Sequence, residues 1–463
     1  MCLRNLKRGA SRYPFRRPFT KWHISGIAVH LKEFEKRRRI LMDLMGPGGI
    51  AVLAAAPESV RSRDVTHSYR QDSDFYYLTG FCEPEAVAVL IPERRQGQFI
   101  IFCRERDRER EMWNGLRAGP EGVVAEYGAD DAFPLEDIDD ILPGLLEQTE
   151  RVYYSMGVFA EFDQRLLTWM RQLRSRRQSG HAPDELITLD HLVHEMRLFK
   201  SAREAKVMKR SARIAEGAHR RAMSICKPGM KEYELAAEFY HEFARHGAEC
   251  SYQPIVASGS NACILHYTEN NAVLNDGDLI LIDAGCEYEL YASDITRTFP
   301  VNGQFSSNQR ALYDIVYAAN RAAIAQVKNG NHWNDPHDAA VKEITRGLRD
   351  VGILKGRLST LLKSKAYLPY FMHKTGHWLG IDVHDVGDYK IADHPRLLEP
   401  GMVMTIEPGI YVSPDMKGVS KSWKGIGIRL EDDVYLSRAG SEVLSNRLPS
   451  SAQEIEEFMG SSS

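Results

Sequence analysis

Residues 281–300 place two aspartates inside a run that otherwise has the composition of a buried strand, LIDAGCEYELYASDITRTFP. Asp283 and Asp294 are eleven positions apart, and this odd spacing within one straight strand would send their side chains to opposite faces. A hairpin with its tip near Tyr288 and Glu289 instead sets Asp283 directly opposite Asp294, with Cβ atoms about 4.5–5.5 Å apart. Two ionised carboxylates at that separation repel each other unless a proton or a cation lies between them. The run therefore predicts a buried hairpin that carries a charged site.

Two further acids lie in strand-like segments near the C-terminus. In MVMTIEPGIYV (402–412), Glu407 ends an apolar run directly before a Pro-Gly turn, and a buried glutamate needs a partner. In GIGIRLEDDVYL (425–436), the alternation places Arg429 and Glu431 on one face. A structural Arg–Glu pair alone would also explain that doublet.

Histidines gather in the segment between these acids. His373, His377 and His384 lie in MHKTGHWLGIDVHDVG, and His266 lies upstream in ILHYTEN. Glycines and β-branched residues disfavour one continuous helix here, so His373 and His377 do not read as a helix-face zinc pair. Such a concentration of histidines beside acids favours a functional site over separate core or surface residues.

The candidate donor set is hard and acidic. Four carboxylates and one imidazole suit neither a cysteine-rich zinc site nor a blue-copper site. Four negative charges would balance two divalent cations. A pair of ions roughly 3.5–4 Å apart, bridged by two carboxylates and a hydroxide, fits the two-metal hydrolase template.

Composition limits the partners and the compartment. The chain has 463 residues, a hydrophobic fraction of 43%, a charged fraction of 27% and a net charge of -3. These values predict two or three soluble globular domains and give no reason to expect nucleic acid or an acidic membrane as a partner. No stretch approaches the roughly 18–20 apolar residues of a membrane helix. Seven scattered cysteines without a C-x-x-C pair favour reduced thiols.

The coarse pattern along the chain predicts two lobes. Apolar residues at helical spacing predict a helix over 31–45, and short apolar runs predict strands. A mixture of strands and helices indicates an α/β first lobe, and long helices beside hairpin-like strands indicate an α+β second lobe. The expected strands are 50–56, 86–92 and 98–104, the expected helices are 145–150, 162–173, 201–226, 233–247, 307–328 and 337–351, and the best linker is 174–185.

The N-terminus differs from the rest in its charge. Before Glu33 the sequence has no acidic residue, while eight residues are basic. This composition is similar to that of an organelle transit peptide, although Pro14 and Pro18 interrupt any long amphipathic helix. A disordered tail or an upstream start codon would explain the segment equally well.

Taken together, the motifs resemble those of bacterial-type aminopeptidase P, a peptidase family with the pita-bread (creatinase/aminopeptidase) fold. The similarity runs from about Leu31 nearly to the C-terminus. It implies an α+β pita-bread metallopeptidase domain over 191–463, a smaller α/β N-terminal domain over 31–190, and a basic extension over 1–30 that lies outside the fold. The matching motifs are ILHYTEN, LIDAGCEYELYASDITRTFP, MHKTGHWLGIDVHDVG, TIEPGIYV and GIGIRLEDDVYL, supported by SYRQDSDFYYLTGFCEPEAVAVLIP and HLVHEMRLFKS.

The resemblance also implies a role for each candidate residue. At a dimanganese site, Asp283 would bind one ion, His377 and Glu407 the other, and Asp294 and Glu431 would bridge the pair. Glu407 would be the acid/base partner of a metal-bridging hydroxide, while His384 and His266 would stabilise the reacting amide. Tyr252, His373, Arg429 and Thr296 would support these groups. Trp113 matches an aromatic that lines the family's site, although a tryptophan between lobes often simply packs.

The implied reaction is hydrolysis of the N-terminal Xaa-Pro bond of peptides. Proline has no amide N–H and a fixed φ, so a site that packs its ring would accept it where an ordinary aminopeptidase would not. Prolidase shares these ligands and accepts only dipeptides, so the metal ligands alone do not distinguish a prolidase from an aminopeptidase P. Methionine aminopeptidase fits less well because it has no counterpart to the large N-terminal lobe. A non-catalytic pita-bread binding protein is a third reading, but such relatives have lost ligands. The family implies a homo-oligomer, a homotetramer or dimer, and a cytoplasmic enzyme unless the N-terminal segment directs import.

Overall fold

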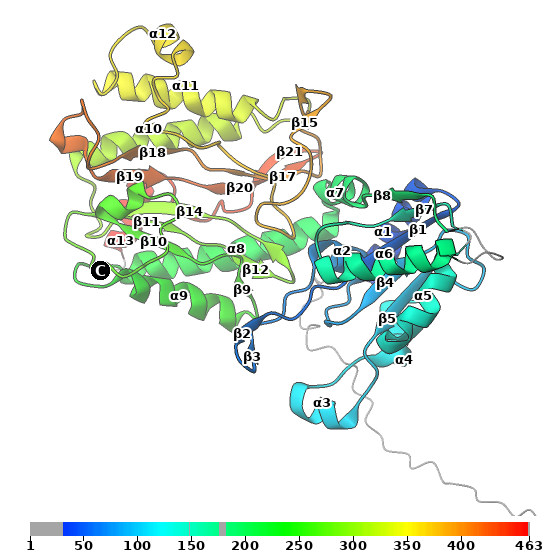
Figure 1. The fold of residues 1–463 in the computed structure, drawn as a ribbon. Helices are drawn as coiled ribbons and strands as arrows, with labels where there is room; N and C mark the ends of the chain where they lie inside the picture. The colour runs from blue at the N-terminus through cyan, green and yellow to red at the C-terminus, as the bar shows by residue number, and fades with distance from the viewer. Residues whose placement is uncertain (1–30, 148, 176–181, 462–463) are drawn as a thin grey trace, which may run out of the picture.

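A computed structural model describes residues 31–147, 149–175 and 182–461 (Figure 1). The basic segment 1–30, with its transit-peptide interpretation, lies outside these residues. So do residues 176–181, which are half of the expected linker 174–185.

The first region is built around one six-stranded sheet in the order β6-β5-β4-β1-β7-β8. Central β1 pairs antiparallel with β4 and parallel with β7, and β1, β4 and β5 form where short apolar runs predict strands. The strands are β1 (Gly49–Ala54), β4 (Val87–Leu90), β5 (Phe99–Cys103), β6 (Asp131–Pro134), β7 (Arg151–Tyr153) and β8 (Glu185–Ile187). A separate hairpin joins β2 (Val60–Ser62) to β3 (Val65–Thr66).

Helices cover both faces of this sheet, which makes the region α/β as predicted. Ala51 and Leu53 face a core that contains Phe34 of α1, whereas Ile50 and Val52 face a core with α5 and α6. The helices are α1 (Leu31–Met45), α2 (Ser73–Thr79), α3 (Arg108–Asn114), α4 (Gly119–Tyr127), α5 (Ile138–Leu146), α6 (Ala160–Ser175) and α7 (Asp190–Leu198), with a 3-10 turn η1 (Leu135–Asp137).

The helix expected over 145–150 is wrong in its position. It is α5, which begins at Ile138 and ends at Leu146. The chain cannot stay helical to residue 150 because the backbone N–H of Glu150 donates to Gly48 O at 2.8 Å, which starts the pairing of β7 with β1.

The second region is a layered α+β structure, as predicted. Figure 1 shows its strands between two pairs of helices, α8 and α9 on one side and α10 and α11 on the other. Antiparallel sheets are formed by β10-β11-β14, β13-β12-β9, β17-β20-β21 and β18-β19. The helices are α8 (Ala202–Ile225), α9 (Glu232–Arg245), α10 (Ser307–Ile324), α11 (Asp335–Asp350), α12 (Leu358–Lys363) and α13 (Ala452–Gly460), with η2 (Gly259–Cys263) and η3 (Lys421–Trp423). The strands are β9 (Glu249–Cys250), β10 (Ile255–Ser258), β11 (Leu279–Asp283), β12 (Cys286–Tyr288), β13 (Tyr291–Ala292), β14 (Thr296–Pro300), β15 (Lys390–Ile391), β16 (His394–Pro395), β17 (Val403–Ile406), β18 (Gly409–Val412), β19 (Ile426–Arg429), β20 (Asp432–Ser437) and β21 (Gly440–Val443).

The long helix α8 shows why sequence signals located these elements well. Ser201 caps it by accepting a hydrogen bond from Glu204 N, and the Glu204 side chain accepts one from the cap backbone. Such a capping box is a recognisable signature of a helix start in a sequence.

The hairpin of the two aspartates forms, but its predicted register is wrong. Asp283 lies opposite Thr296, and Tyr288 pairs with Tyr291. The tip is Glu289 and Leu290, with φ of 52° and 65°, a backbone that two-residue hairpin turns favour. This tip shifts the pairing by two positions relative to the prediction. A shift of two keeps the facing of side chains, so Asp283 and Asp294 still point to one site.

The described part of the chain contains no helix with the length and apolar character that a bilayer crossing demands.

Candidate metal centre

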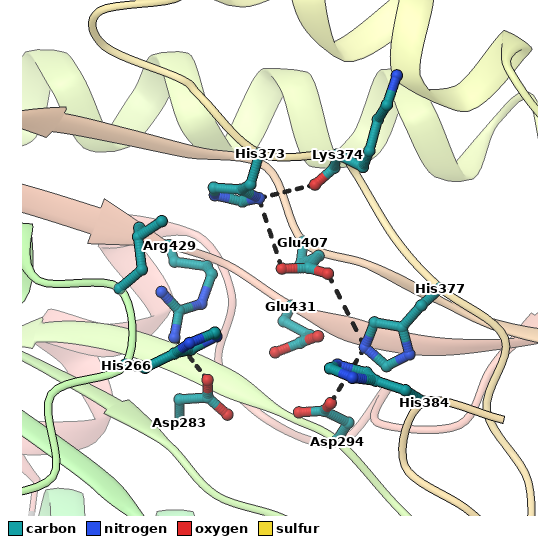
Figure 2. Close-up of a pocket in the computed structure, with 11 residues that line it drawn as sticks. His266, Asp283, Asp294, His373, Lys374, His377, His384, Glu407, Arg429 and Glu431 are labelled. Carbon is teal, nitrogen blue, oxygen red and sulfur yellow. Dashed lines mark hydrogen bonds and ion pairs between the residues drawn. The ribbon is translucent and has the colours of Figure 1, made fainter. Parts of the chain in front are cut away.

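The ends of several strands and two loops enclose a cavity of about 200 Å³ in the second region. Figure 2 shows the carboxylates of Asp283, Asp294, Glu407 and Glu431 turned toward one another inside it, with His377 at one side. The lining residues are Leu265, His266, Asp283, Asp294, His373, Lys374, His377, His384, Glu407, Arg429 and Glu431. All five predicted metal ligands and both predicted catalytic histidines outside that set thus meet in one place.

The two hairpin aspartates share a single hydroxyl. Tyr252 Oη lies 2.5 Å from Asp283 Oδ1 and 2.5 Å from Asp294 Oδ1. Since a phenol carries one proton, it donates to only one of them at a time. Arg429 Nη2 donates to Asp283 Oδ2 at 2.5 Å. Asp283 is therefore paired with the Arg429 guanidinium, whereas Asp294 faces the His377 imidazole, with 3.4 Å between Asp294 Oδ2 and His377 Nε2.

Arg429 is held in turn by a small network. Its Nε donates to Thr296 Oγ1 at 3.2 Å, and its Nη1 donates to Tyr411 Oη at 3.1 Å. The hydroxyl of Thr296 donates to Glu431 Oε2 at 2.7 Å. Tyr411 also lies 2.9 Å from His373 Nε2. The predicted supporting residues therefore lie directly behind the carboxylates and orient them.

Sequence reasoning missed Tyr411. The signal was present, because Tyr411 lies opposite Gly427 in the ladder of β18 with β19, two positions from Arg429 on the same face. Without the pairing of these two strands, however, Tyr411 is one aromatic among many.

His377 is oriented as a metal ligand would be. Its Nδ1 lies 2.9 Å from Trp378 O, and its Nε2 lies 3.4 Å from Asp294 Oδ2 and 3.9 Å from Glu407 Oε1. A backbone carbonyl that accepts from Nδ1–H leaves Nε2 to face the carboxylates, and this arrangement is usual for ligating histidines. Asp294, His377 and Glu431 each offer a donor atom within 4.8 Å of the others.

The electrostatics of the cavity favour added positive charge. Burial, together with the neighbouring carboxylates, raises the pKa of Glu407 to about 7 and that of Glu431 well above its usual value. Burial also raises the pKa of Asp283, and the charge of Asp294 adds to the effect. Burial opposes ionisation of Asp294 too, but its hydrogen bond with His377 holds its pKa below the usual value. Most of these acids therefore resist ionisation unless cations enter.

The donor set fits two divalent metal ions. It offers buried oxygen donors and one imidazole, with more negative charge than Arg429 compensates, and no cysteine is among the described residues that line the cavity. A second group of possible donors among the described residues, Asp74, Asp190 and His194, differs because Arg197 already bonds Asp74 at 2.7 Å.

The two remaining histidines flank the carboxylates. His266 and His384 both line the cavity, and the rings of His384 and His377 meet edge to face with centroids 4.2 Å apart. Burial and then the neighbouring His377 lower the pKa of His384. His384 is therefore a neutral imidazole near pH 7, which can donate one hydrogen bond and accept another.

Trp113 does not lie at this site. It is 81% exposed on α3, a short helix without a buried residue, and it is absent from the cavity lining. The expectation that Trp113 lines the site is therefore not met within one chain. The physical reason is the polar sequence of α3, REREMWN, which gives this helix no apolar face to bury against the second region.

Comparisons with known proteins agree with this geometry. A family model described as metallopeptidase family M24 matches residues 206–438, and one described as the aminopeptidase P N-terminal domain matches residues 34–153. The chain is 46% identical to the Xaa-Pro aminopeptidase of Escherichia coli K12 over 93% of its length and 98% of that protein's. Aminopeptidase PepP of Pseudomonas aeruginosa superposes with a TM-score of 0.93 at 55% identity, over 94% of this chain and 99% of that one. A zinc-substituted aminopeptidase P from Escherichia coli, in complex with product, gives 0.92 at 45% identity, with coverage of 94% and 99%.

Proposed function

The chain belongs to metallopeptidase family M24 as an Xaa-Pro aminopeptidase of the bacterial aminopeptidase P type, and from this premise we propose that two divalent metal ions carry its reaction. The observation that carries the proposal is the convergence of Asp283, Asp294, Glu407 and Glu431 on one buried cavity whose positive charge is too small for them. The substrates are peptides with proline as the second residue.

We assign the five ligands as follows. Asp283 would hold one ion, His377 and Glu407 would hold the other, and Asp294 and Glu431 would contribute to both. Manganese is the proposed metal, because carboxylate oxygens with one imidazole suit it. When bound, the two ions would lower the pKa of a water molecule and polarise the scissile carbonyl.

The protein's own residues would manage the protons and the charge of the reaction. Glu407, which is buried beside the other carboxylates, would accept a proton and return it to the leaving nitrogen of proline. His384 would donate a hydrogen bond to the oxygen on which negative charge develops, and His266 would act at the scissile amide from the other side of the cavity. His373 is held between Tyr411 Oη and Lys374 O, with its Nδ1 3.7 Å from Glu407 Oε2, and it would help to keep that carboxylate in place.

Selectivity for proline follows because the site requires no N–H donor at the scissile nitrogen of the substrate. An imide nitrogen has no hydrogen to donate, so a site that recognises the ring by contact accepts Xaa-Pro bonds. A prolidase would share this feature and accept only dipeptides, whereas a non-catalytic binding protein would retain the fold and not the reaction.

The setting of the enzyme is also part of the proposal. We propose a homo-oligomer, a homotetramer or dimer, in the cytoplasm, where the six described cysteines, all free, would stay reduced. We also propose that the domains divide between residues 190 and 191, so that α7 belongs to the catalytic domain although it lies beside the sheet of the first region.

A paired assay tests this function. Manganese-loaded protein should release free arginine from Arg-Pro-Pro and much less from Arg-Ala-Pro, and a chelator should abolish the reaction. Hydrolysis of Arg-Pro with Arg-Pro-Pro left intact would replace this proposal with the prolidase reading. Peptide binding without any hydrolysis in the presence of manganese would favour the binding protein.

A further inference from the structure

Few side-chain contacts fix the position of the His384 imidazole. His384 lies in the segment 380–388, which forms no helix or strand, and its partly exposed side chain lines the cavity. Among the described residues its ring makes an aromatic contact with His377 and no hydrogen bond. The position of this imidazole is therefore set by whatever fixes the residues on either side of it.

Two acids flank His384, and both are anchored by one arginine. Arg197 Nη2 donates to Asp382 Oδ2 at 2.7 Å and to Asp385 Oδ1 at 2.6 Å. Its Nη1 donates to Asp74 Oδ1 at 2.7 Å, in the first region. Arg197 lies on α7, between the stretches that the two family models match. Three carboxylates from two regions thus meet on one guanidinium.

Further bonds also hold the segment, and two of them come from the first region. Lys200 Nζ donates to Asp385 Oδ2 at 2.8 Å, Ser73 Oγ donates to Asp382 Oδ1 at 2.6 Å, and Arg70 Nη2 donates to Ile381 O at 2.9 Å. Gly380 permits the close approach of Asp385, because a Cβ there would lie 2.0 Å from Asp385 Oδ2. The segment is therefore tightly tied at points on both sides of His384.

We propose that Arg197 is a positioning residue for the peptidase reaction. By bonding Asp382 and Asp385 it holds the His384 imidazole at the rim of the metal centre, and through Asp74 it ties that position to α2 of the first region. This inference rests on the role of His384 in the proposed function. Through its contacts with Arg197, the first region thereby takes part in positioning a catalytic side chain.

The chemistry of the contact requires arginine. A planar guanidinium reaches three carboxylates from two nitrogens, whereas lysine offers one nitrogen with the same charge. Arg197→Lys therefore keeps the charge of a side chain that is 3% exposed and removes the bridge. Arg37→Lys is the matched control. Arg37 is also buried and links the regions, through Glu204 at 3.1 Å and Tyr77 O at 3.0 Å, without a contact to the segment 380–388.

The test is a double-mutant cycle with His384→Ala, using Arg-Pro-Pro and manganese-loaded protein. Arg197→Lys should lower kcat roughly tenfold and change KM less than about threefold, with the manganese content unchanged. In the His384→Ala background the same substitution should lower kcat less than about twofold, since residues that act through one group are not additive. Arg37→Lys should leave kcat near the wild-type value. Ser73→Ala is a milder second variant that should lower kcat about twofold to threefold if Arg197→Lys folds poorly.

Hydrogen exchange supplies a readout that does not depend on activity. In metal-free protein, amides of residues 378–388 should exchange faster in Arg197→Lys and not in Arg37→Lys. An equal loss of kcat from Arg197→Lys with and without His384, or unchanged exchange, would overturn the role of Arg197. Full activity in His384→Ala would instead contradict the proposed role of His384 itself, so the two failures are distinguishable.

Discussion

The metal centre and the cluster around Arg197 both bury several carboxylates, yet they balance their charges differently. Around Arg197, the cations Arg70, Arg197 and Lys200, together with His194, face four carboxylates: Asp74, Asp382, Asp385 and Glu287. Arg197 and Lys200 outweigh burial and hold the pKa of Asp385 below its usual value. In the metal centre, by contrast, burial and neighbouring acids push the pKa of Glu431 upward.

This difference separates a structural cluster from a binding site. A buried acid that the protein has already paired needs nothing further, whereas a group of acids with excess charge and an open cavity needs cations from outside. The two clusters lie on either side of His384, so the balanced one fixes the segment that serves the unbalanced one.

The largest effect should come from removal of Asp294, the proposed bridge. Asp294→Ala should lower kcat/KM for Arg-Pro-Pro at least about 10³-fold, because both ions lose a ligand. Steady-state kinetics in saturating manganese measure the loss. A variant that keeps more than a tenth of the activity would show that Asp294 does not bridge.

Opposite effects on stability should distinguish the clusters in metal-free protein. Asp385→Asn leaves Lys200 buried without its partner and should destabilise the protein by about 3 kcal/mol, or roughly 5–10 °C in Tm. Glu431→Gln replaces a carboxyl whose ionisation is opposed by burial and by the neighbouring acids, and it should leave Tm equal or higher. Thermal unfolding in chelator measures both.

The control for this pair is Glu35→Gln, which breaks an exposed ion pair with Arg39 and should shift stability by less than about 0.5 kcal/mol. Equal destabilisation by Asp385→Asn and Glu431→Gln would remove the distinction between the clusters.

A smaller effect should follow from Asp283→Asn. Asp283 is proposed to hold one ion only, so the variant should keep about one manganese ion per chain and lose roughly 100-fold in kcat/KM. Metal analysis after dialysis gives the ratio. Loss of both ions would mean that Asp283 is as central as Asp294.

The smallest predicted effect concerns Asp72, which caps α2 beside the balanced cluster by accepting from Phe75 N at 2.8 Å. Burial raises its pKa from 3.8 to about 6. Because the pKa of Asp72 is higher in the folded than in the unfolded protein, ionisation of its carboxyl lowers the free energy of unfolding. This destabilisation grows as the pH rises from 3.8 to 6 and is complete above pH 6. Asp72→Asn keeps the cap and should be about 1 kcal/mol more stable than wild type at pH 8, with the gain lost below pH 4.

Asp107, the cap of α3, provides the control for that substitution. Its hydrogen bonds from Arg110 N and Glu109 N lower its pKa, so Asp107→Asn should show no gain at pH 8. A gain of similar size in both variants would point to helix propensity instead of burial.

Much of this molecule could be predicted from sequence where the determining contacts are local. Helix α8 follows from the capping box at Ser201, and the strands β1, β4 and β5 follow from apolar runs. The grouping of Asp283 with Asp294 depended only on the odd spacing and the face rule, which is why it survived the wrong register. That register depends on positive φ at Glu289 and Leu290. Neither glutamate nor leucine is a residue type from which such a turn is predicted.

The residue roles that could not be predicted from the sequence depend on contacts between segments that are far apart in the chain. Tyr411 acquires its role only when β18 pairs with β19, and Arg197 only when α7 meets the segment around His384. The family resemblance implied that Trp113 lines the site, but in the structure of one chain Trp113 lies away from it. In each case the missing information is which distant segments touch.

The number of manganese ions bound at saturation tests the account most directly. Equilibrium dialysis followed by elemental analysis should find two ions per wild-type chain and none in Asp294→Ala, with Glu35→Gln matching the wild type. One ion or none in the active wild-type protein would contradict the claim that the excess charge of this cavity serves a pair of metal ions.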